Sequence, residues 1–294
     1  MDESISLTMI TGSVVQKGSK TNAFTRSPTS AFGSPGSPFA PRFLRPIAMA
    51  TPATVLVLGA TGKTGIPLVE QLLQRGAAVR ALVRSPEKLP KPEGQAQLSV
   101  TQCSSVLDLT DQELLEQVKG CEAVVSCLSH VGNPWAKPHD LCLSISKRIC
   151  SAMQQAAQAE TTGTRPKYLM MGTVLVPKAD GSEKAHGWAS TFMVGLLNTL
   201  LPPMYDHKLT AAYLNENMSS ENPLVDHVVI RPNLLVDKPV SEYQTFDELQ
   251  TGVFSPQDCS RANVAQFMCD LILKPDLWAQ WKGKMPVIID KVAA

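Results

Sequence analysis

Short apolar runs alternate with segments of helical periodicity along most of the chain. Thr54–Leu58 is a continuous run of aliphatic and β-branched residues, which is typical of a strand buried on both faces of a parallel sheet. From Gly65 onward apolar residues recur at helical spacing until Gly76. A second strand-like run follows over 77–83. This opening unit predicts a strand, a turn, a helix and a strand.

The same alternation continues toward the C-terminus. It predicts strands over 97–103, 123–128, 168–171, 227–230 and 286–289, and helices over 111–119, 141–158, 193–201, 209–218 and 264–273. Alternating strands and helices form βαβ units, in which helices cover both faces of a parallel sheet. We therefore expect an α/β fold with a doubly wound parallel sheet (a Rossmann fold) and a small variable C-terminal region.

The composition excludes several classes of protein. Lys and Arg number 27 against 26 Asp and Glu, and 44% of the 294 residues are hydrophobic. A balance this close to neutral gives no electrostatic signature for nucleic acid. The longest apolar stretch, 191–201, is too short to span a membrane. The seven cysteines show no C-x-x-C spacing, so we expect neither a disulfide framework nor a metal site.

Residues 1–50 differ from the rest of the chain. They hold two acids, five bases, eight Ser, five Thr and five Pro, which is typical of an organelle transit peptide, although an ordinary disordered tail has a similar composition. The stretch 30–41 resembles presequences of algal plastid proteins. We expect a disordered presequence at 1–50, cleaved near 48–51, and a domain at 51–294. The location would then be the plastid stroma, or the cytoplasm if the segment is only a tail.

The junction between the first strand and the first helix carries a glycine-rich loop. Its residues are Gly59, Ala60, Thr61, Gly62, Lys63, Thr64 and Gly65. In a dinucleotide-binding loop the first glycine permits the tight turn, the second lets the backbone approach the pyrophosphate, and the third lets the helix pack on the sheet. The order of residues excludes a P-loop, because Lys63 and Thr64 precede the last glycine. The loop predicts a nucleotide site, in which Lys63 contacts a phosphate or is merely solvated.

The end of the second strand indicates which dinucleotide is bound. An acidic residue there would hold the ribose 2′-hydroxyl of NAD and repel a 2′-phosphate. This chain has Arg84 at that point, and a guanidinium suits a phosphate. We therefore expect NADP (as NADPH), with NAD less favoured. An exposed surface arginine is the alternative.

Together with Arg231-Pro232 after a later strand, these motifs resemble the atypical short-chain dehydrogenase/reductases over residues 53–290. The most similar branch is the NmrA-like group, which includes flavin and biliverdin reductase-type enzymes. The resemblance implies that Asp108 lies beside the adenine and that Leu128, within 126–129, lines the channel on the nicotinamide side. Asp108 as a plain turn residue is the alternative.

Catalytic residues follow from the same resemblance. Members of that family use a Ser and a Tyr-x-x-x-Lys pair. Here Thr173 stands where the Ser would lie, and only two residues separate Tyr205 from Lys208. Spacings of three and four share a helix face, so we assign catalysis to Thr173, Tyr205 and Lys208. His207 is a competing proton donor, because its ordinary pKa suits neutral pH.

These features predict an NADPH-dependent oxidoreductase acting on a small carbonyl-bearing or planar substrate. The broken Tyr-Lys spacing leaves open a non-catalytic NAD(P)-binding sensor or assembly factor, and an isomerase or epimerase also fits the fold. His130 and Trp135 either shape the pocket or pack a loop, and the apolar segment 192–204 forms core or a lid. The substrate and the oligomeric state stay open.

Overall fold

The computed structural model describes residues 52–91, 97–130, 134–135, 137–159, 165–178, 183, 187–218 and 224–291. The transit peptide predicted at 1–50 lies outside these residues and stays a prediction. Within the described part of the chain, no helix has both the length and the apolarity that a membrane span needs.

Strands from the whole described chain form one central sheet. Its strands are β1 (Thr54–Leu58), β2 (Ala78–Val83), β3 (Leu98–Gln102), β4 (Ala123–Ser126), β5 (Lys167–Met171), β6 (Asp226–Pro232), β8 (Tyr243–Phe246) and β10 (Val287–Asp290). Their spatial order is β3-β2-β1-β4-β5-β6-β10-β8. All neighbours run parallel except β8, which pairs antiparallel with β10. The order reverses between β1 and β4, so the predicted doubly wound topology is confirmed.

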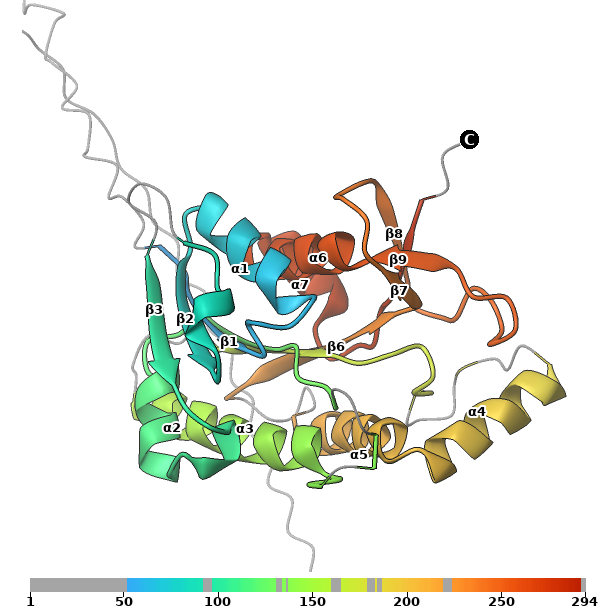
Figure 1. Cartoon of the computed structure of the whole chain (residues 1–294), viewed down its shortest axis with the longest axis horizontal. Helices are drawn as coiled ribbons and strands as arrows, with labels where there is room; N and C mark the ends of the chain where they lie inside the picture. Colours follow the sequence, from blue (N-terminus) through green and yellow to red (C-terminus); the bar gives the residue numbers. More distant parts are fainter. Residues whose placement is uncertain are drawn as a thin grey trace, which may run out of the picture. The chain divides into compact units, whose positions relative to one another are not determined.

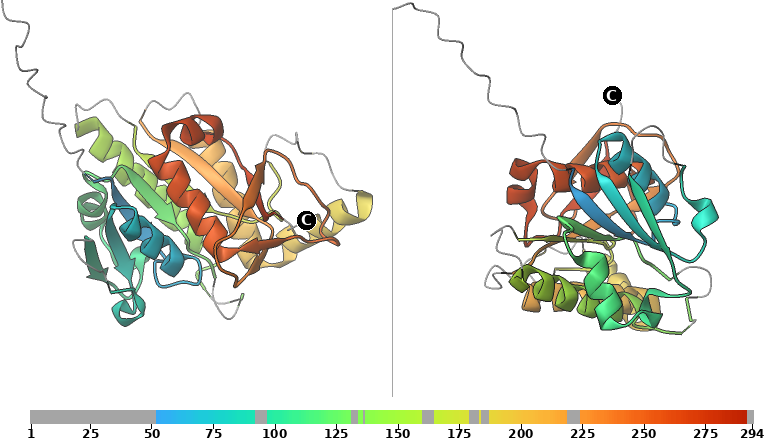
Figure 2. Two further views of the ribbon diagram at one scale, coloured as in Figure 1. Left: turned by 90° about the horizontal axis from the view of Figure 1, so that it is seen from above. Right: turned by 90° about the vertical axis from the view of Figure 1, so that its left-hand side faces the viewer.

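Helices cover both faces of this sheet. They are α1 (Gly65–Gln74), α2 (Asp111–Val118), α3 (Leu141–Ala159), α4 (Trp188–Leu200), α5 (Pro202–Asn217), α6 (Arg261–Leu273) and α7 (Pro275–Trp281). Figure 1 shows α1, α6 and α7 above the sheet and α2, α3 and α5 below it. The right-hand view of Figure 2 likewise shows helices on the two sides of the strands. α4 packs against α5 and extends toward one end of the molecule.

The apolar runs supply two cores, one on each face of the sheet. In β1, Val55 and Val57 join the core under α1 and α6, whereas Leu56 and Leu58 join the core under α2 and α3. All four side chains have 0% exposure. A strand between two helical layers must be apolar at every position, which explains the unbroken run in the sequence.

The structure differs from the predicted elements mainly after β5. α4 begins at Trp188 instead of residue 193, and α5 begins at Pro202 instead of residue 209. Pro202 ends one helix and starts the next, because a proline at the first helical position has no backbone N–H to leave unpaired. The short strands β7 (Leu234–Val236) and β9 (Asp258–Ser260) pair in a separate ladder, and they are too brief for a sequence pattern.

Candidate functional site

The carboxyl ends of the parallel strands meet at one edge of the sheet. The glycine loop follows β1, residues 127–130 follow β4, and Thr173 follows β5. In doubly wound sheets ligands bind outside these ends, where the strand order reverses. The reversal lies between β1 and β4. The predicted site segments from these three strands therefore share the edge that ligands use in this fold.

Two glycines shape the loop between β1 and α1. Gly59 has a φ of +74°, and a Cβ there would lie 2.9 Å from the backbone carbonyl carbon of Cys127, just beyond β4. A Cβ on Gly65 would lie 2.1 Å from the carbonyl oxygen of Gly59. No larger residue fits at either position without a backbone shift. The loop thus brings the start of α1 directly against the sheet, as the sequence predicted.

The N-terminus of α1 faces this loop without a side-chain cap, although Thr64 occupies the capping position. By contrast, Thr110 and Glu113 form a capping box on α2, and Ser260 caps α6. The Ile66 N–H donates to the Gly62 carbonyl at 2.9 Å and Pro67 has no N–H, so the start of α1 offers mainly the positive end of the helix dipole and the N–H groups that precede Ile66. This arrangement suits a phosphate. At Gly62 an added Cβ would meet only the Gly59 oxygen, at 3.1 Å, so the other side of Gly62 is open.

Lys63 projects from the loop into solvent and contacts a carboxylate from a distant segment. Its Nζ donates to Oδ2 of Asp237 at 3.3 Å, and Nη1 of Arg261 donates to Oδ1 of Asp237 at 2.6 Å. Asp237 follows β7, and Arg261 begins α6. Two cations therefore converge on one exposed carboxylate beside the glycine loop.

The remaining predicted cofactor residues lie around the same edge. Arg84 directly follows β2, and its side chain is exposed. Asp108 ends a 3₁₀ turn after β3 and is also exposed. Thr61 and Leu128 are partly buried, in the glycine loop and after β4. All four therefore lie in segments that follow the carboxyl ends of β1, β2, β3 and β4.

A cavity of about 490 Å³ opens beyond the ends of β5 and β6. One wall is α4 and another is the segment 249–256. The lining is mostly apolar, as in typical small-molecule sites. The lining residues are Thr173, Val174, Leu175, Pro177, Glu183, Ser190, Thr191, Val194, Gly195, Asn198, Lys208, Asn233, Leu234, Leu249, Thr251, Gly252, Val253 and Pro256.

Two of the three predicted catalytic residues line this cavity. The hydroxyl oxygen of Thr173 accepts the backbone N–H of Leu175 at 3.3 Å, which leaves the hydroxyl proton available to a ligand. Lys208 reaches the cavity from the second turn of α5. Tyr205 lies on the same helix but is 49% exposed and is not part of the lining. The structure therefore brings Thr173 and Lys208 together, and leaves Tyr205 outside.

Neither His207 nor His130 is among the residues that line the cavity. Burial lowers the pKa of His207 to about 4, so this ring is neutral at pH 7 and holds no acidic proton to donate. Because its side chain is 4% exposed and lies outside the cavity lining, the structure gives no support to His207 as a competing proton donor. His130 lies against the buried carboxylate of Asp206, at 2.9 Å, and not in the cavity lining. It packs the loop after β4.

A buried ion pair lies behind the cavity wall. Arg231, which has 0% exposure, donates from Nη1 to Oε2 of Glu183 at 2.9 Å and from Nε to the carbonyl of Met285 at 2.8 Å. Glu183 also lines the cavity. Because Arg231 neutralises it, Glu183 adds little net charge there. Sequence reasoning singled out Arg231 only through its motif and did not find Glu183.

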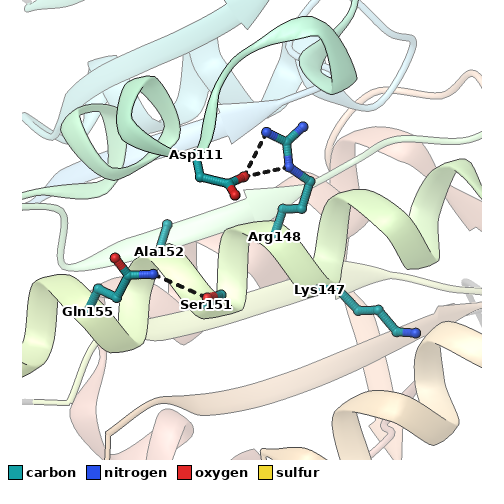
Figure 3. A pocket seen from close by; sticks show the side chains of 6 residues that line it. All are labelled: Asp111, Lys147, Arg148, Ser151, Ala152 and Gln155. Carbon is teal, nitrogen blue, oxygen red and sulfur yellow. Dashed lines mark hydrogen bonds and ion pairs between the residues drawn. The ribbon is translucent and has the colours of Figure 1, made fainter.

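A second, smaller hollow of about 180 Å³ lies between α3 and the start of α2 (Figure 3). Arg148 there donates to Asp111 at 2.8 Å and to the carbonyl of Leu107 at 2.9 Å. These bonds fasten α3 to the start of α2. Since its arginine is engaged in this way, the hollow is a packing feature and not the candidate site.

Within the described residues, no group of three or more His, Cys, Asp or Glu side chains is placed to hold a metal ion.

Asn198 is a further lining residue that the sequence did not reveal. Its amide nitrogen donates to the carbonyls of Leu175 and Val194 at 2.6 and 2.9 Å. The amide thereby fastens α4 to the segment after β5.

The chain is similar to a known protein family and to several solved structures. A family model described as NAD(P)H-binding matches residues 59–275. No curated protein matches the chain. The match begins at the glycine loop and extends through α6, so it covers both the strand ends and most of the cavity.

Solved structures share the fold at low identity. A protein from Lactobacillus casei has a TM-score of 0.58 and 21% identity, over 81% of this chain and 100% of that one. An oxidoreductase from Lactococcus lactis has a TM-score of 0.56 and 15% identity, over 82% and 92%. A short-chain dehydrogenase/reductase from Veillonella parvula has a TM-score of 0.57 and 13% identity, over 82% and 95%. Identities this low show a common fold and nothing about the substrate.

Proposed function

Because the chain belongs to the NAD(P)H-binding family, we propose that it is an NADPH-dependent oxidoreductase that reduces a small carbonyl-bearing or planar substrate. One observation carries the proposal. The cavity that contains Thr173 and Lys208 opens at the same edge of the sheet as the glycine loop. The nicotinamide supplies a hydride when it is bound, and a substrate in this cavity would lie at the same edge.

The cofactor residues are assigned by position. Gly59, Gly62 and Gly65, with Thr61, Lys63 and Thr64 between them, hold the diphosphate at the uncapped start of α1. Arg84 binds the 2′-phosphate, which is the basis for preferring NADPH to NADH. Asp108 lies beside the adenine, and Leu128 beside the nicotinamide.

The residues of the chain then provide the polar chemistry. The free hydroxyl proton of Thr173 hydrogen-bonds the carbonyl oxygen of the substrate. The Lys208 ammonium stabilises the negative charge that grows on this oxygen and supplies the proton. Tyr205, one turn before Lys208, is the alternative source of this proton, and that role needs its exposed side chain to turn toward the cavity.

Fluorescence titration with NADPH and NADH, followed by turnover assays on quinones, flavins and aldehydes, tests the proposal. We expect NADPH to bind at least 10-fold more tightly than NADH, since a paired 2′-phosphate contributes more than about 1.4 kcal/mol. Thr173→Val and Lys208→Met should each lower kcat at least 100-fold and leave the NADPH Kd within 3-fold. Lys282→Met, between α7 and β10, is the matched control.

The non-catalytic sensor remains the competing function, favoured by the exposure of Tyr205 outside the cavity. Tight NADPH binding with no turnover on any of these substrate classes would support the sensor. If neither NADPH nor NADH binds, both functions are overturned.

A further inference from the structure

The outer face of α4 is an exposed apolar stripe. Trp188 is 84% exposed and Phe192 is 65% exposed, and Leu196 and Leu200 continue the series at intervals of four residues. Side chains four apart lie on one side of a helix. Large exposed apolar surfaces of this kind mark interaction sites. The inner side of the same helix lines the cavity through Ser190, Val194 and Asn198.

Neither charge nor free hydroxyl donors interrupt this stripe. Residues 187–204 contain no Asp, Glu, Lys or Arg. The hydroxyl of Thr191 donates to the carbonyl of Gly187 at 3.2 Å, and that of Thr199 donates to the carbonyl of Gly195 at 2.8 Å. Ser and Thr hydroxyls commonly bond the carbonyl four residues earlier in helices, and here this bond engages both hydroxyl protons. The exposed face of α4 therefore presents methyl groups and rings.

The opposite wall of the cavity carries a matching feature. Phe254 is 62% exposed and belongs to the segment 249–256, most of which lines the cavity. Figures 1 and 2 show this segment and the start of α4 at the same end of the molecule. Leu234, another lining residue, is 49% exposed. Exposed aromatic side chains therefore belong to both elements that enclose the apolar cavity.

We infer that this rim, formed by α4 and the segment 249–256, docks on the surface of an uncharged lipid bilayer and that the substrate is a lipophilic carbonyl compound drawn from it. The substrate part rests on the proposed function: NADPH gives a hydride to the carbonyl carbon, a proton goes to the oxygen, and the products are NADP⁺ and an alcohol. An apolar compound leaving the bilayer passes between the rings into an apolar cavity. Its carbonyl group meets Thr173 and Lys208 at the polar end.

A second copy of the chain is a poorer occupant of this surface. α4 has 13 residues, so its outer face is about 20 Å long and about 10 Å wide. The resulting area of about 200 Å² for α4, which is one of the two elements of the rim, is well below the roughly 800 Å² per partner of a stable interface. A bilayer surface needs only a few rings inserted among its headgroups. The absence of charge on α4 favours zwitterionic over anionic lipid.

Flotation of the full chain with phosphatidylcholine vesicles tests the docking. We expect the wild-type chain to float, equally at 0.1 and 0.5 M NaCl (about 10 Å and under 5 Å of screening length). The double variant Trp188→Ser, Phe192→Ser should lower the floated fraction at least 5-fold. Val100→Ser, a change at an exposed apolar side chain on the far edge strand β3, should not alter it. The docking is overturned if the wild-type chain does not float, or if it floats only with anionic vesicles. It is also overturned if the chain forms a dimer that this double variant abolishes.

The substrate is tested with two ketones of the same carbonyl chemistry, 2-dodecanone in the vesicles and 2-butanone in buffer. The double variant should raise KM for 2-dodecanone at least 5-fold while KM for 2-butanone and the NADPH Kd stay constant. The proposal of a lipophilic substrate is overturned if KM changes equally for both ketones. It is also overturned if the chain binds NADPH but does not turn over 2-dodecanone. Loss of NADPH binding in the wild type overturns the proposed function instead, and leaves the flotation result standing.

Discussion

The carboxylate of Asp206 lies 2.9 Å from Nε2 of His130, and both side chains are almost wholly buried. The same carboxylate accepts the backbone N–H groups of Cys142 and Leu143 at 2.8 and 3.0 Å. One side chain therefore connects the first turn of α5, the loop after β4 and the start of α3. Lys208 stands two residues farther along α5, so this connection fixes the helix that brings Lys208 to the cavity.

Removing this connection should cost much of the stability of the domain. Asp206→Ala leaves two backbone donors and His130 buried without an acceptor, and we expect a loss of about 3 to 5 kcal/mol in the free energy of unfolding. Asp206→Asn keeps one acceptor and should lose less. Urea denaturation measures both, with the exposed Glu248→Ala as control. A loss below about 1 kcal/mol for Asp206→Ala would contradict the role.

Acid should destabilise the protein through His207. Burial lowers the pKa of His207 from 6.5 to about 4, partly opposed by Asp206. The unfolded chain takes up a proton near pH 6.5, whereas the folded chain does so only near pH 4. Stability is therefore complete above pH 6.5 and falls by about 3 kcal/mol as the pH approaches 4. Urea midpoints from pH 7 to pH 4 measure this, and burial lowers the pKa of His227 in the same direction.

A matched pair of variants isolates this contribution. His207→Gln should flatten most of the slope between pH 6.5 and pH 4, because the amide does not titrate. The exposed His139→Gln should keep it. An unchanged slope in His207→Gln would assign the acid sensitivity to other groups.

The sequence predicted the sheet and the glycine loop well because both depend on local chemistry. A strand between two helical layers needs an unbroken apolar run such as Thr54–Leu58. A loop that passes so close to the end of β4 that a Cβ at position 59 would lie 2.9 Å from the Cys127 backbone needs glycine there. These constraints are visible in a few adjacent residues.

The cavity was not predictable in the same way. It joins Thr173, Lys208 and the segment 249–256, which are distant in the sequence and carry no shared pattern. Tyr205 illustrates the limit, because a spacing rule placed it beside Lys208 on one helix face while the fold leaves it half exposed. The burial of His207 follows from packing around α5, which periodicity does not report.

Gly65→Ala should disrupt the start of α1. The new Cβ would lie 2.1 Å from the Gly59 oxygen and 2.8 Å from the Ala60 Cα, so the helix must move off the loop. We expect a loss of about 3 kcal/mol or more in unfolding free energy and the loss of NADPH binding. Gly195→Ala is the control, since nothing lies within 4 Å of its added Cβ. That change should raise stability by about 0.5 to 1 kcal/mol.

Arg84→Glu should change the cofactor preference. A carboxylate at this exposed position repels a 2′-phosphate and can accept a hydrogen bond from a ribose hydroxyl. The NADPH Kd should rise on the order of 10- to 100-fold, while the NADH Kd stays constant or falls. Isothermal titration with both nucleotides measures this, with Lys282→Glu as a control for net charge. Equal weakening of both nucleotides would place Arg84 away from the 2′-phosphate.

Asp237→Asn should strengthen cofactor binding, which is the opposite of what most changes near a site do. The Asp237 carboxylate is exposed, and it engages Lys63 of the glycine loop and Arg261 at the start of α6. A diphosphate on the loop must compete with this carboxylate for Lys63. Neutralising it removes the competitor and a repulsive charge, so the NADPH Kd should fall a few-fold, most clearly at low ionic strength, where exposed charges are least screened. The thermal midpoint should stay unchanged, since exposed ion pairs contribute little to stability.

Lys63→Met in the Asp237→Asn background provides the control, because it should cancel the gain. A Kd that rises in Asp237→Asn would mean that Asp237 positions Lys63 for the phosphate instead of competing for it.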